Sequence, residues 1–295
     1  MGSEYLSGAG RDILRVVTYN LREGGLDGDG VETGTGAIDI SRWEQQIKLL
    51  LLLKPDVLCL QEGKYYDRND FEMARRTGQA LGMKWYLAPS NSHGSHLVTL
   101  VNPRRVEVRR FVPDAAEGKF HHTLARADLV DLRPGGNFTV LNTHLDPFSP
   151  ANRAREVTWL TEYGARDDVI LAGDLNSEVP GDPAVTSWSW LPAELHSRHR
   201  FQNPDGTYAG SDRRALSALL HAGFRDPVTH LGFPSARTVG YWSPTEQRDF
   251  RSDYVLPARG MAPQLKNLLV PDTDDIRAMS DHLPVCGDFA LPHQP

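Results

Sequence analysis

The sequence predicts a mixed α/β (α+β) fold, and three observations support this prediction. Strand-like apolar runs recur along most of the 295-residue chain, and they are too numerous for a helical bundle. A few helical segments lie between these runs. The segment Arg133–Gly136, with the sequence RPGG, separates two of the runs and is typical of a hairpin turn. The central sheet is therefore expected to be at least partly antiparallel.

The expected strands are short apolar runs. In chain order they are Leu14–Asn20, Asp56–Leu60, His96–Val101, Arg104–Val112, Thr123–Leu132, Phe138–Thr143, Val169–Ala172, Asp253–Leu256 and Pro284–Phe289. The two cysteines, Cys59 and Cys286, both lie inside such runs and are expected to be buried. This usage excludes a disulfide framework and a thiolate zinc site.

The clearest helix is expected over Ser41–Leu53. Ser41 and Glu44 have the spacing of a capping box at its start, and Pro55 stops it at the other end. Apolar residues at helical spacing give this helix one face that can be buried.

Two further helices are expected later in the chain. One begins after Ser149, with Pro150 in its first turn, and runs towards Gly164. The other covers about Ser211–Ala222 and ends at Gly223.

Two long segments are expected to be loops. Glu23–Gly36 is rich in Gly and Asp, and Ser177–Gly210 is rich in Pro, Trp and His. Loops longer than about 15 residues in a compact domain are usually functional or disordered. The second segment carries His196–Arg200, with the sequence HSRHR, which can contact phosphate, although a solvated loop is the more common role of such a run.

The composition is that of a folded protein. The chain is 40% hydrophobic and 24% charged, which excludes a disordered, collagen-like or membrane-spanning chain. A net charge of -6 argues against a uniformly basic nucleic-acid surface, although a local positive groove remains compatible with it. Residues 1–12 are expected to be flexible and lack an apolar signal core, so the expected location is the cytoplasm. Residues 13–291 are expected to form a single domain.

Carboxylate, amide and imidazole side chains stand at the ends of the expected strands and not within them. These residues are Asn20, Glu62, His144, Asp174, Asn176, Asp253, Asp281 and His282. If the strand ends converge, one pocket receives four carboxylates, two amides and two imidazoles. Such oxygen ligands suit Mg²⁺ or Mn²⁺, which bind phosphate oxygens. Two histidines beside carboxylates suit proton transfer near neutral pH.

The short motifs around these residues resemble those of the endonuclease/exonuclease/phosphatase superfamily, and they occur in the order of that family. They are TYN at Asn20, LQE at Glu62, NTHL at His144, GDLN at Gly173–Asn176, SDY at Asp253 and SDH at Asp281–His282. The resemblance covers nearly the whole sequence. It implies the fold of pancreatic deoxyribonuclease, a four-layer sandwich of two packed mixed β-sheets flanked by helices, and Mg-dependent hydrolysis of phosphoesters.

The resemblance also implies roles for individual residues. Glu62 resembles the principal Mg²⁺ ligand, with Asp281 and Asn20 completing or supporting the site. Asp253 resembles the carboxylate that orients His282.

The remaining motif residues resemble those that handle the phosphate. Asp174 and Asn176 resemble residues that position the nucleophile and the scissile phosphate. His144 resembles a phosphate clamp or a proton donor to the leaving oxygen, and Asn20, Asn176 and His282 are expected to contact the phosphate as well. The sequence leaves open whether Asp174 or His282 takes the proton of the attacking water.

Five other residues have two interpretations each. His121 and His122 are more readily explained as half-exposed strand residues than as ligands. Arg126 can reach a phosphate but more often such an arginine pairs with a carboxylate. Tyr241 and Trp242 fit core packing and stacking on a substrate equally well.

Three functions are compatible with this pattern. The first is a Mg-dependent hydrolase of phosphodiester bonds in nucleic acid or a nucleotide. The second is a phosphomonoesterase acting on inositol phosphates, phospholipid headgroups or other small phosphate esters. The third is a catalytically inactive binding or scaffold protein, which no broken motif in the sequence favours. Neither an integral membrane association nor an obligate protein partner is expected.

Overall fold

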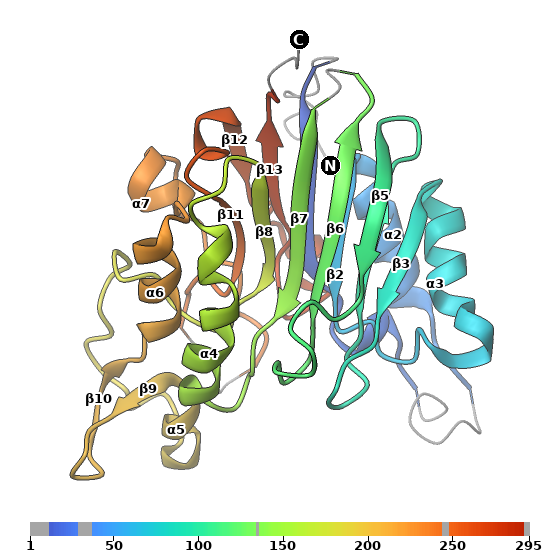
Figure 1. Ribbon diagram of the computed structural model, residues 1–295. Helices are drawn as coiled ribbons and strands as arrows, with labels where there is room; N and C mark the ends of the chain where they lie inside the picture. Colours follow the sequence, from blue (N-terminus) through green and yellow to red (C-terminus); the bar gives the residue numbers. More distant parts are fainter. Residues whose placement is uncertain (1–11, 29–36, 134–135, 244–247, 292–295) are drawn as a thin grey trace.

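Continuous apolar runs form the central strands, because both faces of these strands are buried. Every residue of β1 (Leu14–Asn20) and β2 (Val57–Gln61) is buried. In the computed structural model, which describes residues 12–28, 37–133, 136–243 and 248–291, such strands build two packed sheets (Figure 1). The predicted mixed α/β fold is confirmed.

Both sheets are mixed. The six-stranded sheet has the spatial order β12 (Leu265–Leu269), β13 (Val285–Phe289), β1, β2, β4 (Leu97–Val101) and β3 (Lys84–Ala88). The five-stranded sheet has the order β11 (Asp253–Pro257), β8 (Val169–Asp174), β7 (Asn137–His144), β6 (Leu124–Asp131) and β5 (Val106–Val112). In each sheet one neighbouring pair is parallel, β1 with β2 and β7 with β8, whereas the other pairs are antiparallel.

The three largest clusters of buried apolar residues in the described ranges define four layers. Side chains such as Val16, Cys59, Val140 and Ile170 pack between the two sheets. The outer face of the six-stranded sheet is covered by α2 (Ser41–Leu53) and α3 (Arg68–Leu81), and the outer face of the other sheet by α4 (Pro150–Glu156) and α6 (Arg214–Ala222) (Figure 1). The four-layer sandwich that the family resemblance implied is therefore present.

The expected strands are all found, but two edge strands were missed. Neither β3 nor β12 has a clear apolar run, since KWYLA and LKNLL each contain charged or polar residues and are only partly buried. Helix α3 was also missed, because its sequence is largely polar. At the edges of the sandwich, burial is too incomplete to leave a strong pattern in the sequence.

The predicted helix starts and ends need three corrections. The capping box at Ser41 is wrong, because Ile40 is the N-cap and Asp39 accepts a hydrogen bond from the backbone N–H of Ser41 at 2.8 Å. The helix after Ser149 ends at Glu156 and continues as two 3₁₀ turns, Val157–Trp159 and Thr161–Tyr163.

These 3₁₀ turns are rich in β-branched and aromatic residues, which have low helix propensity. The third helix begins at Arg214 instead of Ser211, and it ends at Gly223 as expected.

The second expected loop contains secondary structure. We call residues 182–211 the arm. It contains η5 (Ala193–Leu195), α5 (His196–His199) and a hairpin of β9 (Arg200–Gln202) and β10 (Tyr208–Ser211), and it projects at the lower left of Figure 1. These elements have only three or four residues each, which is too short to produce a periodic pattern.

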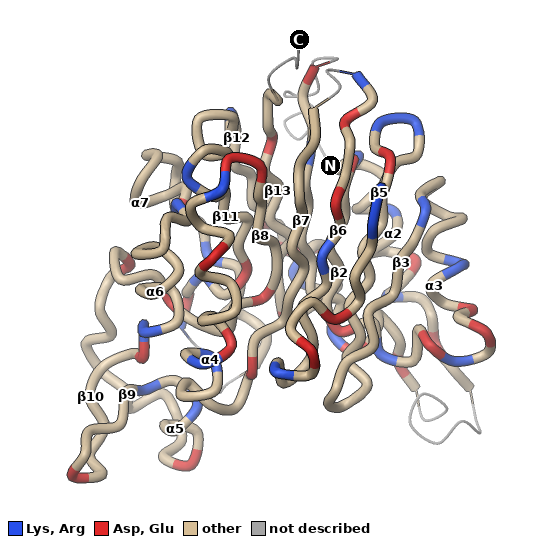
Figure 2. Tube along the Cα trace, viewed as in Figure 1, with Lys and Arg blue, Asp and Glu red and all other residues tan. Residues whose placement is uncertain are grey.

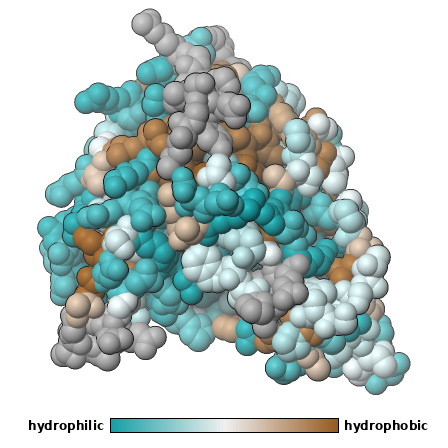
Figure 3. Space-filling model, turned by 180° about the vertical axis from the view of Figure 1, so that it is seen from behind, coloured by the Kyte–Doolittle hydropathy of each residue, from teal (hydrophilic) through white to brown (hydrophobic). Residues whose placement is uncertain are grey.

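Some expectations fall outside the described residues. They are the flexible N-terminus up to residue 11, residues 29–36 of the first expected loop, and residues 134–135 of the expected turn. No helix in the described ranges is long and apolar enough to cross a membrane. The face opposite to the view of Figure 1 is largely hydrophilic, with apolar side chains gathered in its upper part (Figure 3).

Gly173 allows β7 and β8 to approach closely just before Asp174. A Cβ at this position would overlap the carbonyl oxygen of Thr143 on the neighbouring strand. We therefore expect Gly173→Ala to lower the free energy of unfolding by about 3 kcal/mol, because two paired backbones have to move apart. Urea denaturation measures this loss. Gly210→Ala is a useful control, since a Cβ there would meet nothing within 4 Å and Gly210 does not have a positive φ, and an equal loss in both variants would contradict the explanation.

Candidate active site

The polar strand ends converge because of the sheet topology. β1 and β2 are parallel and end side by side, with Asn20 opposite Gln61, and Glu62 follows directly. β7 and β8 are also parallel, with His144 opposite Asp174.

Two antiparallel strands begin at the same edge. Asp253, the first residue of β11, is opposite Asp174. Asp281 and His282 lead into β13, which pairs with β1. Figure 2 shows acidic residues at these strand ends.

Asp174 is the centre of the hydrogen-bond network. Its Oδ1 accepts hydrogen bonds from the hydroxyl of Ser252 at 2.6 Å and from the backbone N–H of Asn176 at 3.0 Å. Its Oδ2 accepts from the side-chain amide of Asn20 at 3.2 Å and lies 3.3 Å from Nε2 of His144. The side chain is 1% exposed, so these partners replace the water that a buried carboxylate loses.

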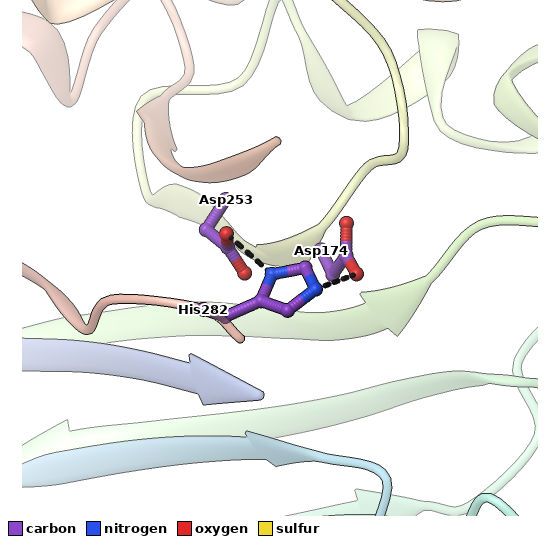
Figure 4. A group of neighbouring side chains, drawn as sticks. All are labelled: Asp174, Asp253 and His282. Carbon is purple, nitrogen blue, oxygen red and sulfur yellow. Dashed lines mark hydrogen bonds and ion pairs between the residues drawn. The ribbon is translucent and has the colours of Figure 1, made fainter. Parts of the chain in front are cut away.

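His282 lies between two carboxylates (Figure 4). Its Nδ1 donates to Oδ2 of Asp253 at 2.8 Å, and its Nε2 lies 3.7 Å from Oδ2 of Asp174. The backbone N–H of Asp253 donates to the hydroxyl of Thr238 at 3.1 Å, which holds this carboxylate at the strand start. The imidazole is therefore fixed by Asp253 on one side and directed towards Asp174 on the other.

The charges of these three groups depend on one another. Burial raises the pKa of Asp253 to about 6. Burial alone would lower the pKa of His282, but the adjacent Asp253 and Asp174 carboxylates outweigh it and raise the pKa well above its ordinary value. Burial would likewise raise the pKa of Asp174, yet the imidazoles of His282 and His144 and the hydrogen bond from Ser252 bring it below its ordinary value. Of the two possible bases, His282 is thus the stronger.

Asn20 connects Asp174 to Glu62. Its amide nitrogen donates to Oε1 of Glu62 at 3.2 Å as well as to Asp174, and its carbonyl oxygen accepts from the backbone N–H of Arg22 at 3.0 Å. Asn20 is completely buried and in this arrangement supports the carboxylates. Glu62 has a positive φ of 53° and receives a second hydrogen bond, from the backbone N–H of Glu23 at 3.1 Å. Glu62 is only partly buried.

The SDH segment is fixed to β1. The hydroxyl of Ser280 donates to the backbone oxygen of Asn20 at 2.8 Å and accepts from the backbone N–H of His282 at 3.2 Å. Asp281 is partly buried and lies 3.8 Å from Nε of Arg22, the closest ion pair of this carboxylate among the described residues.

Asn176 also has an unusual backbone conformation, with a positive φ of 46°. Its side-chain amide donates to the backbone oxygen of Leu145 at 3.0 Å. Asn176 lines a cavity that His282 and Asp281 also line. The structure thus brings all eight predicted residues to one edge of the sandwich.

The donor atoms at this edge fit a hard divalent cation. One oxygen of Asp253, Oδ1, is buried without a hydrogen-bond partner in the described part of the chain. Asp174, Asp253 and His282 offer ligand atoms within 4.8 Å of one another. Both cysteine thiols lie buried in β2 and β13, away from this set. Carboxylate and amide oxygens without thiolates are typical of Mg²⁺ or Mn²⁺ sites.

His122 is a site residue that the sequence did not indicate. It was expected as a half-exposed strand residue, but it precedes β6, is 2% exposed, and stacks on His144 with ring centroids 4.3 Å apart. Burial, together with His144 and His121, lowers the pKa of His122 to about 2, so this ring is neutral. Nδ1 of His144 has no hydrogen-bond partner among the described residues. Stacking is thus the contact that orients this side of the His144 ring.

We expect His122→Ala to lower kcat about tenfold with little change in KM, because His144 loses the ring that holds it. Steady-state kinetics on any accepted phosphate ester measures both values. His122→Phe keeps a planar ring and should retain most of the rate. Equal losses of kcat in the two variants would show that ring stacking does not explain the effect of His122.

The other ambiguous residues have structural partners. Arg126 donates to Asp128 at 2.8 Å, as the carboxylate-pairing interpretation predicts. His121 does not lie in a strand and has its Nδ1 3.6 Å from Asp146. The hydroxyl of Tyr241 donates to the backbone oxygen of Ser280 at 2.8 Å, and this ring packs on the core. The guanidinium of Arg22 lies 4.4 Å from the ring centroid of Trp242, at the rim of the site.

A cavity of about 210 Å³ opens beside His282. The arm forms one of its walls, with Trp190, Arg198 and His199 among the lining residues. Only part of the HSRHR run is therefore placed to contact a ligand. Arg198 and His199 line the cavity, whereas Arg200 donates to backbone oxygens of β10.

Comparisons with known proteins agree with this architecture. A sequence model described as the endonuclease/exonuclease/phosphatase family matches residues 17–282. No curated protein gives a significant match.

Three solved structures represent the structural neighbours. An AP endonuclease from Archaeoglobus fulgidus is 20% identical, covers 94% of this chain and 100% of its own, and has a TM-score of 0.63. The AP endonuclease of Leishmania major is 14% identical, with 96% and 89% covered and a TM-score of 0.61. ANGEL2, described as a 2',3'-cyclic phosphatase, is 14% identical, with 94% and 95% covered and a TM-score of 0.55. At these identities the similarity establishes the fold.

Proposed function

The chain belongs to the endonuclease/exonuclease/phosphatase family, a family of phosphoesterase enzymes, and we propose that it hydrolyses phosphodiester bonds in nucleic acid or a nucleotide with the help of Mg²⁺. The observation that carries this proposal is the contact of one buried carboxylate, Asp174, with Asn20, His144 and the His282–Asp253 pair. A scaffold protein would not need two imidazoles directed at a buried carboxylate, which are groups suited to moving protons.

Each residue has a role in an in-line displacement. Water attacks the phosphorus as the bond to the leaving oxygen breaks, and His282 takes a proton from this water through Nε2. Asp253 holds the His282 ring in the required orientation and stabilises its protonated form. His144 donates to the leaving oxygen, and the second N–H of the Asn176 side-chain amide donates to a phosphate oxygen. Bound Mg²⁺ would neutralise the phosphate and leaving-oxygen charge, with Glu62 and Asp281 as ligands.

The choice of His282 as base rests on its surroundings. Asp174 already accepts hydrogen bonds from Ser252, Asn176 and Asn20, which weaken it as a proton acceptor. In this assignment Asp174 orients the water and His282, and supports His144.

The first experiment incubates supercoiled plasmid and a single-stranded RNA with the purified protein in Mg²⁺ or Mn²⁺. Cleavage that is lost with EDTA and with His282→Ala would support the proposal. His221→Ala, at an exposed histidine of α6, is the matched control and should leave cleavage unchanged. Intact nucleic acid combined with phosphate release from inositol phosphates or other small esters would support the phosphomonoesterase alternative. No turnover of any of these substrates would support the scaffold alternative.

The pH dependence tests the assignment of the base. The carboxylates raise the pKa of His282, so a higher pH is needed to free the base, and the rate should rise with pH through a value above 6.5. Asp253→Asn removes the charge that raises this pKa. We expect the acid limb of the pH profile to move to lower pH while the maximal rate falls. An acid limb that stays in place in this variant would instead assign the limb to another group.

A further inference from the structure

The cavity beside His282 has the size of one ring system. Its volume is about 210 Å³, whereas a protein cavity of about 150 Å³ can hold a benzene molecule. Trp190 and Leu195 of the arm, Val239 and Phe250 of an isolated β-bridge outside the two sheets, and Asn176 and His282 of the catalytic set all line it. Aromatic and aliphatic walls of this kind accept the face of a sugar or a nucleobase.

Arg198 gives the cavity a positive charge without an internal partner. Among the described residues no carboxylate or carbonyl oxygen accepts a hydrogen bond from its guanidinium, which lies over the ring of Phe148 at 4.9 Å. The other arginines of the arm and of the segments packed against it all donate to oxygen acceptors: Arg153, Arg200, Arg213, Arg214, Arg248 and Arg251. A guanidinium without an internal hydrogen-bond acceptor beside a cavity is suited to bind an anionic group of a ligand.

His199 adds a second polar group to the same wall. Burial, with the neighbouring Arg153, lowers the pKa of His199 to about 4, so the ring is neutral at pH 7 and can donate one hydrogen bond. Its backbone oxygen accepts from the backbone N–H of Asp212 at 2.9 Å, and Arg153 donates to the backbone oxygen of Arg198 at 2.7 Å. The helix that carries both residues is therefore attached to the sandwich and not free to swing away. Figure 2 shows basic residues on α4, α5 and β9 in this region.

We propose that the cavity binds a nucleotide unit, with its ring between the arm and the sandwich and a second phosphate, distinct from the scissile one, held by Arg198 and His199. This inference rests on the proposed function, because it places the scissile phosphate at Asn176 and His282. The substrate class is a phosphodiester whose nucleoside carries a further phosphate, either as a terminal group or as the next linkage of a strand.

A matched pair of small esters tests the proposal. Thymidine 5'-(4-nitrophenyl phosphate) and the same ester with a 3'-phosphate differ only in the second phosphate, and both release 4-nitrophenolate. We expect the 3'-phosphate to raise kcat/KM of the unmodified protein about tenfold or more, the effect of charge-assisted hydrogen bonds to one phosphate. In Arg198→Gln this advantage should disappear, and in Arg198→Lys, which keeps the charge but not the planar fork, part of it should remain.

Arg155→Gln is the control, because it removes an equal charge from an exposed position on α4 that does not line this cavity. It should keep the full advantage. The proposal is overturned if the unmodified protein does not distinguish the two esters, or if Arg198→Gln distinguishes them as well as the unmodified protein does. A dinucleotide, in which an internal phosphodiester replaces the terminal 3'-phosphate, tests whether the second phosphate is a terminal group or the next linkage of a strand.

A binding measurement keeps this result apart from the catalytic proposal. Calorimetry in EDTA compares thymidine 3',5'-bisphosphate with thymidine 5'-monophosphate. Tighter binding of the bisphosphate that depends on Arg198, in a protein that hydrolyses neither ester, would support the site and reject the proposed function. Hydrolysis of both esters at equal rates, with equal binding of both nucleotides, would support the function and reject the site.

Discussion

Asp174→Asn is expected to lower kcat about 10³-fold without unfolding the protein. An asparagine of nearly the same shape can still accept hydrogen bonds from Ser252 and the backbone of Asn176 through its oxygen. Its amide nitrogen then replaces Oδ2, which in the native protein faces the Asn20 amide and the imidazoles of His144 and His282. Three groups that approach a carboxylate would meet a donor, and the negative charge that fixes both imidazoles would be gone.

The measurement is single-turnover kinetics at saturating substrate and metal, with circular dichroism to verify the fold. Asp128→Asn is the matched control, since it removes a carboxylate from β6 whose partners are Arg126 and Thr139, outside the site. We expect that control to stay within about twofold of the unmodified protein, in line with a surface substitution. A rate for Asp174→Asn within a factor of ten of the unmodified enzyme would remove Asp174 from the centre of the mechanism.

The sequence located this network because rigid apolar strands carry its members. Asp174 follows VILAG and Glu62 follows DVLCLQ, and two parallel strand pairs bring such ends to one edge. Strand register, however, cannot be deduced from composition, so the sequence could not reveal that Asn20 connects Glu62 with Asp174. His122 was missed for a similar reason, since its burial comes from a stack across three-dimensional space and not from a pattern along the chain.

The fold was predictable where burial is complete. Strands such as β1 and β2, which are buried along their whole length, leave a continuous apolar run. The edge strand β3 and the arm leave weaker patterns in the sequence, because solvent-exposed positions tolerate many different residue types. The arm also shows why a sequence with a recognisable catalytic set does not define its substrate: the arm residues that line the cavity, including Trp190 and Arg198, lie outside the family motifs.

Removal of divalent metal is expected to abolish hydrolysis, and Glu62→Gln should show where that metal binds. The carboxylate of Glu62 accepts only two hydrogen bonds within the described residues, from Asn20 and the backbone of Glu23, so lone pairs remain for a cation. A glutamine keeps the size of the side chain but loses its charge. We therefore expect EDTA to eliminate activity, Mg²⁺ to restore it, and Glu62→Gln to raise the Mg²⁺ concentration for half-maximal rate about 10- to 100-fold.

Titration of activity against Mg²⁺ distinguishes this role from a role in proton transfer. If Glu62 binds the metal, excess Mg²⁺ should recover part of the lost rate in Glu62→Gln, whereas no amount of metal should rescue His282→Ala. Glu72→Gln, at an exposed position of α3, controls for the general loss of negative charge and should follow the unmodified titration curve. Activity that persists in EDTA would overturn the metal-dependent mechanism, because His282 and His144 would then have to neutralise the phosphate without help. An unchanged Mg²⁺ requirement in Glu62→Gln would move the metal towards the Asp174, Asp253 and His282 group, whose ligand atoms already lie within 4.8 Å of one another.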